Sequence, residues 1–140
     1  ARPGCSSAGS RALVRRVPIA DHVARYAIAL TRLTRPTQPE APSLVKQYVT
    51  WGAGPRASQY LVLAAKARAV LQGRLHVERD DVHAVAHPVL RHRIRTNFHA
   101  EAEGITTDSL IDQLLSSIPT VDQEADGSIL AKVFRSADAR

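Results

Sequence analysis

Apolar side chains recur at steps of three and four residues across residues 17–34, and this spacing constrains the fold more than any other feature of the chain. Side chains spaced in this way share one face of an α-helix, and that face must be buried against other elements. They are Ile19, Val23, Tyr26, Ala27, Leu30 and Leu33. Asp21 suits the first turn of this helix, where negative charge meets the positive end of the dipole. Pro36 ends the pattern, because the residue before a proline avoids the helical conformation.

A proline-rich link follows and leads into a second, shorter helix. Three prolines lie within residues 36–42 and make this connection rigid. The last of them, Pro42, suits the first position of a helix, where a missing N–H costs little. We expect this helix to include Val49 and Trp51 and to stop at the Gly-Ala-Gly stretch of residues 52–54.

The longest run rich in alanine and leucine predicts a helix over residues 55–72. Gly73 stands where a left-handed cap would end it. Residues 74–77 are long enough only for a strand-like bridge. A short helix is then expected from about Asp80, where the paired acids suit the first turn, and Pro88 is expected to start a separate turn.

A last helix is predicted over residues 107–117, where leucines and an isoleucine form an apolar face. Residues 95–105 before it have the character of an irregular link that ends at Gly104. Within this link, Glu101 and Glu103 are expected to make surface or interdomain contacts. A catalytic carboxylate pair would need a pocket and a second group, and the sequence indicates neither.

These elements predict an all-α fold, a compact bundle of about five helices joined by short links. The ordered domain is expected to span residues 14–119. Residues 1–13 are small and polar and are expected to form a flexible lead-in, while residues 120–140 have few apolar side chains and are expected to form a loose tail.

The composition limits the partners of the chain without choosing one. Nineteen lysines and arginines against 13 acidic residues give a formal net charge of +6, which favours phosphates, nucleic acid or acidic protein surfaces. The single cysteine, Cys5, cannot form an internal disulfide. No apolar run approaches the roughly 18–20 residues of a membrane span. We therefore expect a soluble, cytoplasmic protein.

The sequence Trp-Gly-Ala-Gly-Pro-Arg at residues 51–56 raises the main functional question. Gly54 and Pro55 allow a tight turn into the long helix, so that Arg56 lies beside backbone N–H groups without intrahelical partners. A cation there opposes the helix dipole by roughly 0.3–1 kcal/mol. A bound phosphate would remove this cost, because arginine binds phosphate through two parallel hydrogen bonds. An exposed arginine without a role, or one paired with a nearby carboxylate, fits the same spacing.

Histidines and other arginines are weaker candidates. His83 and His87 are four residues apart, as in zinc-binding helices, but the glutamate base and a third ligand are missing, so no metal site is expected. Arg91, Arg93 and Arg95 form a basic cluster that fits a solvated face, a docking surface or a nucleic-acid contact. Aromatic residues are not interleaved with them, which argues against a stacking platform for single-stranded nucleic acid. A basic helical nucleic-acid-binding or protein-interaction module is the alternative function.

Four segments, in order, carry a family resemblance: VPIADHVARYAIALTRLTRP, YVTWGAGPRASQYLVLAAKARAVLQGR, HVERDDVHAVAHPVLRHRI and AEAEGIT. Together they cover about residues 14–118 and resemble the C-terminal helical lid of MoxR-type AAA+ ATPases. The resemblance implies that the GAGPRAS segment is the sensor 2 element. At the matched position, Arg56 would reach the γ-phosphate of ATP held by the core domain, with Gly54 and Pro55 as its supporting turn.

The resemblance also implies a setting for the lid. ATP and Mg²⁺ would bind to the full-length parent, whose core domain would be the first partner of the lid. Hydrolysis would change the angle of the lid, and the movement would pass through a homo-oligomeric ring, expected to be a hexamer. The family is associated with chaperone-like maturation of client proteins, often together with von Willebrand factor A-domain proteins.

The motifs that bind and hydrolyse nucleotide in that family are absent from this chain. The sequence has no G-x-x-x-x-G-K-[ST] phosphate loop and no G-x-G-x-x-G or G-x-S-x-G motif. The Walker B, sensor 1 and arginine-finger elements are missing as well. We therefore expect this chain alone to have no measurable ATPase activity and at most weak nucleotide binding.

Overall fold

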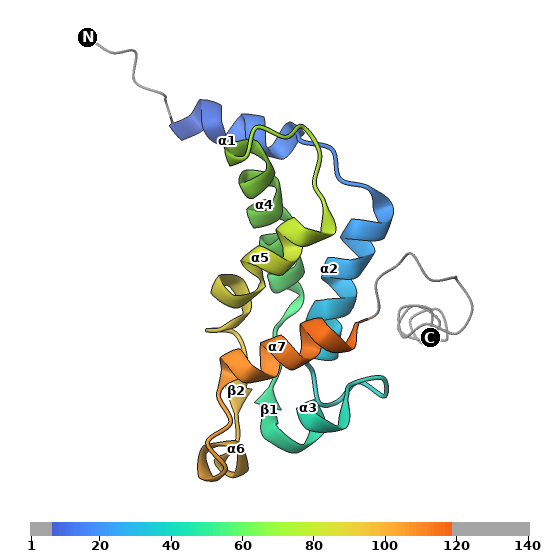
Figure 1. The fold of residues 1–140 in the computed structure, drawn as a ribbon, viewed down its shortest axis with the longest axis vertical. Coiled ribbons are helices and arrows are strands. Elements are labelled where there is room, and N and C mark those ends of the chain that lie inside the picture. The colour runs from blue at the N-terminus through green and yellow to red at the C-terminus, as the bar shows by residue number, and fades with distance from the viewer. Residues whose placement is uncertain (1–6, 119–140) are drawn as a thin grey trace.

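Residues 7–118 are described by a computed structural model, in which they form seven helices and one small sheet (Figure 1). The helices are α1 (Ser7–Arg16), α2 (Asp21–Leu33), α3 (Ser43–Tyr48), α4 (Pro55–Leu71), α5 (Arg79–Leu90), α6 (Phe98–Ala102) and α7 (Thr107–Ser117). Strands β1 (Val49–Trp51) and β2 (Arg95–Thr96) pair antiparallel. The predicted all-α class is confirmed, with this short sheet added. The expectations for residues 1–6 and 119–140 lie outside the described residues.

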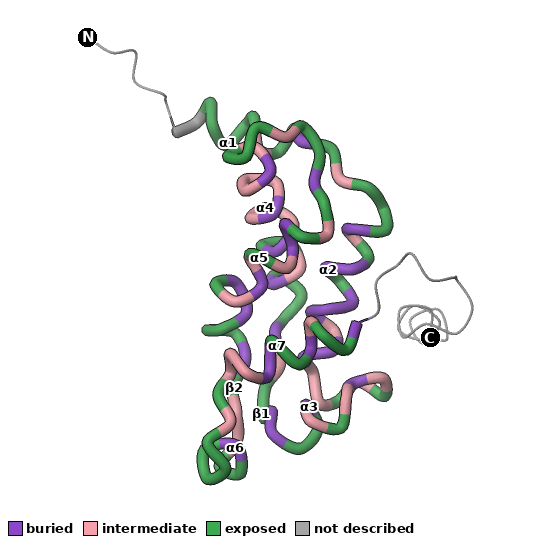
Figure 2. The backbone as a smooth tube through the Cα atoms, viewed as in Figure 1, coloured by how far each residue is buried: buried purple, intermediate pink, exposed green. Residues whose placement is uncertain are grey.

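The core lies between α2, α4, α5 and α7, where buried backbone gathers in Figure 2. Helix α4 packs on both α5 and α2, and α7 packs on α5 and α2. The apolar stripe predicted for residues 17–34 is buried from Val23 to Leu33, and each of its valine and leucine side chains contributes about 1.5–3 kcal/mol by leaving water. The small sheet, α3 and α6 lie at the end of the molecule opposite α1 (Figure 1).

Several predicted boundaries agree with the structure. Helix α4 begins at Pro55, and α7 covers the predicted residues 107–117. Gly73 has a φ of 73°, the left-handed conformation that its place after α4 requires and that side chains with a Cβ disfavour. Val77 forms an isolated parallel bridge with Ile19, as the strand-like reading of residues 74–77 anticipates.

The N-terminal segment differs from its prediction. Residues 7–13 were expected in a flexible lead-in, but they belong to α1. This helix packs on α4, and the Lys66 Nζ donates a hydrogen bond of 3.3 Å to the carbonyl oxygen of Arg15 in its last turn. Contact with α4 therefore stabilises α1, a helix that could not be predicted from its short run of small and polar residues.

The region around the small sheet also differs from its prediction. The second helix was expected to include Val49 and Trp51, but α3 ends at Tyr48 and these residues form β1. Residues 95–105 were expected to be an irregular link, and they contain β2 and α6. Asn97 caps α6 by accepting a hydrogen bond of 3.1 Å from the Ala100 N–H. A two-residue partner strand is too short to be recognised from its own sequence.

Helix α5 continues through Pro88, where a separate turn was expected. Proline cannot donate to the carbonyl four residues earlier, which is that of Ala84. Ala84 and Pro88 are both exposed, so water can bind that carbonyl. Val89 and Leu90 follow directly and are buried, and their packing keeps the last turn of α5 against the core.

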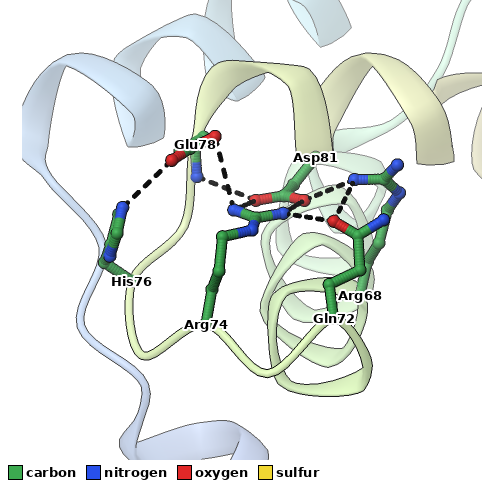
Figure 3. Close-up of polar contacts among 6 residues, drawn as sticks. All are labelled: Arg68, Gln72, Arg74, His76, Glu78 and Asp81. Carbon is green, nitrogen blue, oxygen red and sulfur yellow. Dashed lines mark hydrogen bonds and ion pairs between the residues drawn. The ribbon is translucent and has the colours of Figure 1, made fainter.

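A buried carboxylate joins the end of α4 to the start of α5 (Figure 3). Asp81 is fully buried, and its Oδ1 accepts hydrogen bonds from Arg68 at 2.6 Å and from Arg74 at 2.5 Å. Its Oδ2 accepts from Arg74 at 2.8 Å and from the Glu78 N–H at 2.9 Å. The paired acids were expected only as first-turn helix charge. That describes the exposed Asp80, whereas Asp81 is the centre of an interhelical ion cluster.

Substitution of Asp81 by Asn should lower the free energy of unfolding by about 2–4 kcal/mol, because Arg68 and Arg74 then lose their shared anion. Urea denaturation of the chain measures this change. The matched control is Asp80→Asn at the neighbouring exposed position, for which we expect a change below about 1 kcal/mol. Equal effects of the two substitutions would contradict the assigned role of Asp81.

Acid should weaken the fold through the same carboxylate. The hydrogen bonds from Arg74 lower the pKa of Asp81 from 3.8 to about 2, with Glu78 N–H and Arg68 adding to the effect and burial opposing it. Because the folded pKa is the lower one, this stabilisation is complete above about pH 4–5 and is lost as the pH falls towards 2, a change of about 2 kcal/mol. The stability difference between the wild type and Asp81→Asn should shrink across this range. A difference that stays constant would refute the prediction.

Candidate functional site

Arg56 is exposed in the first turn of α4, as the sequence predicts. Gly54 is the N-cap residue, with φ −76° and ψ 174°, and Pro55 is the first helical residue. No side chain caps this end of the helix, and the Ala57 N–H donates to the Gly54 carbonyl at 2.9 Å. The guanidinium group therefore stands beside the positive end of a helix of 17 residues.

No residue of the described range 7–118 forms an ion pair with Arg56. The first turn of α4 also carries no acidic residue. The alternative in which a nearby carboxylate neutralises Arg56 therefore finds no support within this range. Within the described residues, the charge of Arg56 is therefore not neutralised.

Residues 52–55, here called the entry turn, are fixed to the end of α2. The Ala53 N–H donates a hydrogen bond of 2.9 Å to Thr34 Oγ1, and Arg35 Nε donates one of 2.8 Å to the Ala53 carbonyl. Thr34 in turn donates to the Thr31 carbonyl at 2.6 Å, and both Thr34 and Ala53 are fully buried. The sequence analysis missed these contacts, because they join residues 18 and 19 positions apart.

The two glycines of the entry turn differ in how much space surrounds them. A Cβ on Gly52 would overlap the Thr34 carbonyl oxygen and Arg35 Cα, so glycine is required for the close approach of the two backbones. A Cβ on Gly54 would meet nothing within 4 Å, and the φ of Gly54 is ordinary. Of the two glycines, it is therefore Gly52 that the close contact with the end of α2 requires.

The basic cluster of residues 91–95 is partly neutralised by other residues of the described fold. Arg91 Nε donates a hydrogen bond of 2.8 Å to Asp108 on α7. The Arg93 guanidinium lies over the ring of Tyr60, with its Cζ 4.8 Å from the ring centroid, within the roughly 6 Å of a cation–π contact. Arg95 lies in β2 and is exposed. The cluster thus contributes to contacts with α7 and α4 and is not one free cationic face.

The two histidines do not converge on a common ligand. The His83 Nε2 lies 2.6 Å from the hydroxyl of Tyr26, and burial lowers the pKa of His83, with Arg79 adding to this effect. His87 contacts Asp108 and Asp112 on α7 at 3.3 and 2.8 Å. Within residues 7–118, no group of three or more metal-ligating side chains is present.

The two carboxylates of the predicted link, Glu101 and Glu103, lie in or beside α6. Glu101 lies in α6, and Glu103 directly follows its last residue, so both belong to this short helix or its end and not to an irregular link. Glu103 accepts a hydrogen bond of 2.5 Å from the Tyr48 hydroxyl, which raises the pKa of Tyr48. This contact joins α6 to α3.

Comparison with protein families finds a match to the AAA lid domain over residues 41–114, more than half of the 140-residue chain. The matched range includes the entry turn, Arg56 and Asp81. A solved structure of a presumed ATPase from Cytophaga hutchinsonii is 33% identical and superposes with a TM-score of 0.73, over 77% of this chain and 33% of that one.

Curated relatives also match by sequence, and two of them are MoxR proteins. The chain is 34% identical to chaperone MoxR1 of Mycobacterium tuberculosis over 93 residues, which are 66% of this chain and 25% of that protein. It is 41% identical to protein MoxR of Paracoccus denitrificans over 70 residues, which are 49% of this chain and 20% of that protein. The chain thus spans about a quarter of the length of these relatives. Within residues 7–118, no helix has both the length and the apolar character to cross a membrane.

The unequal surroundings of the two glycines predict unequal effects of adding one methyl group. Gly52→Ala should destabilise the lid by about 1–3 kcal/mol, since the new Cβ must displace backbone at the end of α2. Gly54→Ala should change stability by less than about 1 kcal/mol. Urea denaturation of both variants checks the comparison. If Gly52→Ala were as stable as the wild type, the close approach would be wrong.

Proposed function

Because this chain belongs to the AAA lid domain family, as the helical lid of a MoxR-type AAA+ ATPase, we propose that it covers ATP bound to a core domain of the same protein. In this proposal Arg56 contacts the γ-phosphate and makes the lid sensitive to the state of the nucleotide. Lid closure would then differ between ATP and ADP, and the difference would be passed to neighbouring subunits.

The observation that carries this proposal is the unbalanced charge of Arg56. The residue is exposed at the first turn of α4, and the described range supplies neither an ion-pair partner nor a first-turn acid. A cation in this place opposes the helix dipole by about 0.3–1 kcal/mol. A polyphosphate would offset this cost, because it is attracted both by the guanidinium and by the N-terminal end of the helix.

The proposed ligand is ATP with Mg²⁺, held mainly by the core domain. From the lid, Arg56 would supply two N–H donors in a planar arrangement that matches two phosphate oxygens. Its contribution would be to favour the geometry and charge of the γ-phosphate during transfer, since phosphoryl transfer depends on positioning and electrostatic stabilisation. The lid residues perform no proton transfer in this account.

The activity, assembly and partner of the parent protein are proposed from its relatives. MoxR1 of Mycobacterium tuberculosis is named a chaperone, and we propose chaperone-like remodelling or maturation of client proteins for the parent of this lid. A homo-oligomeric ring, with a hexamer as its expected form, would carry the lid movement between subunits. A von Willebrand factor A-domain protein is the proposed partner in that work.

Nucleic-acid binding is the less favoured function. Its main support was the cluster of Arg91, Arg93 and Arg95, but Arg91 pairs with Asp108 and Arg93 stacks on Tyr60. Two of the three cations are therefore engaged within the lid.

In the full-length parent ATPase, Arg56→Ala should lower the kcat of ATP hydrolysis by about 10–100-fold, as expected for loss of one charge-assisted contact of about 1.5–3 kcal/mol. The stability of the lid should change by less than about 0.5 kcal/mol, because Arg56 is exposed and makes no packing contact that the fold needs. Steady-state hydrolysis and thermal unfolding measure the two quantities.

The matched control is Arg25→Ala, which removes an exposed arginine from α2 and leaves the entry turn intact. It should hydrolyse ATP at the wild-type rate. Wild-type hydrolysis by the Arg56→Ala enzyme would rule out the sensor role.

A further inference from the structure

We propose that Arg35 is a positioning residue for Arg56, acting through the peptide group that joins Ala53 to Gly54. The inference rests on the proposed function of Arg56 and adds a second residue to it. Arg35 lies outside the entry turn and 21 positions before Arg56 in the chain. It reaches the turn by the hydrogen bond of 2.8 Å from its Nε to the Ala53 carbonyl oxygen.

The base of the Arg35 side chain is fixed by its own backbone. Helix α2 ends at Leu33, and the Arg35 N–H donates to the Arg32 carbonyl at 3.0 Å. Pro36 follows and restricts the backbone of Arg35. The side chain therefore leaves from a rigid corner at the end of α2 and extends to the entry turn.

The entry turn is held on both sides of Ala53, but the two contacts control different peptide groups. Thr34 Oγ1 accepts from the Ala53 N–H at 2.9 Å and fixes the peptide group between Gly52 and Ala53. Arg35 binds the Ala53 carbonyl, which belongs to the next peptide group, between Ala53 and Gly54. Gly54 cannot restrain that group itself, because glycine is permissive and its missing Cβ would touch nothing within 4 Å.

Arg35 therefore sets the orientation of the peptide group that leads into the N-cap of α4. Without it, Thr34 and the close approach of Gly52 still hold the turn against α2, so the fold should persist. The direction in which α4 presents its first turn would be less restricted. A displacement of about 1 Å in a positioning element can cost on the order of 100-fold in rate.

The test uses the full-length parent ATPase with Arg35→Met, which keeps an unbranched apolar side chain and removes the Nε donor. We expect kcat for ATP hydrolysis to fall about tenfold, while the lid keeps its helical content and cooperative unfolding. Arg35→Lys retains a donor and should recover part of the lost rate. Arg25→Met, the same substitution at an exposed position of α2, should leave the rate unchanged.

The double variant Arg35→Met with Arg56→Ala separates positioning from a general structural effect. If Arg35 acts through Arg56, the double variant should be no slower than Arg56→Ala alone. Independent losses that multiply, or a rate for Arg35→Met equal to the wild type, would overturn the inference while leaving the role of Arg56 intact. An unimpaired Arg56→Ala enzyme would instead refute the proposed function, and with it the role of Arg35.

Discussion

The arrangement of the lid depends on the buried carboxylate of Asp81. It binds Arg68 near the end of α4 and Arg74 in the following link, while its own backbone belongs to the first turn of α5. A buried carboxylate without these cations would be costly, and the cations without it would lose their shared anion. The cluster therefore fixes the angle at which α4 meets α5. At its other end, α4 is fixed by the contacts of Ala53 with Thr34 and Arg35. The place of Arg56 follows from both attachments.

The arginines of this basic chain divide into two kinds. Arg68, Arg74, Arg91 and Arg93 have carboxylate or aromatic partners within the described lid, so their charge contributes to the fold. Arg56 has no such ion-pair partner there and stands where a helix repels cations. Net charge alone did not separate these kinds, since a total of +6 fits several acidic partners. The difference in local surroundings makes Arg56 the candidate for an external anion.

The sequence predicted the elements whose signals are local. The apolar period of α2, the proline at the start of α4 and the left-handed Gly73 each act within one element, and all three agree with the structure. The predictions failed where an element depends on contact with a segment distant in the sequence. The strand Val49–Trp51 exists because residues 95–96 pair with it, and α1 is helical against α4. One local signal was overlooked, namely Asn97, which caps the start of α6.

In the candidate site, too, the local features were predictable from the sequence and the long-range contacts were not. The place of Arg56 at an exposed helix start follows from Gly54 and Pro55, and the structure agrees. The contacts that hold the entry turn could not be inferred, because nothing local distinguishes Thr34 and Arg35 from other residues at a helix end. The structural need for Gly52 appears only when the end of α2 is brought against it.

The most direct test of the central claim is the affinity of the parent ATPase for two nucleotides, ADP and a non-hydrolysable ATP analogue, with and without Arg56→Ala. Titration calorimetry measures both affinities. If Arg56 contacts the γ-phosphate, the substitution should weaken binding of the analogue by about tenfold or more, or about 1.4 kcal/mol, and leave ADP binding nearly unchanged. An equal loss for both nucleotides, or no loss for either, would contradict the claim.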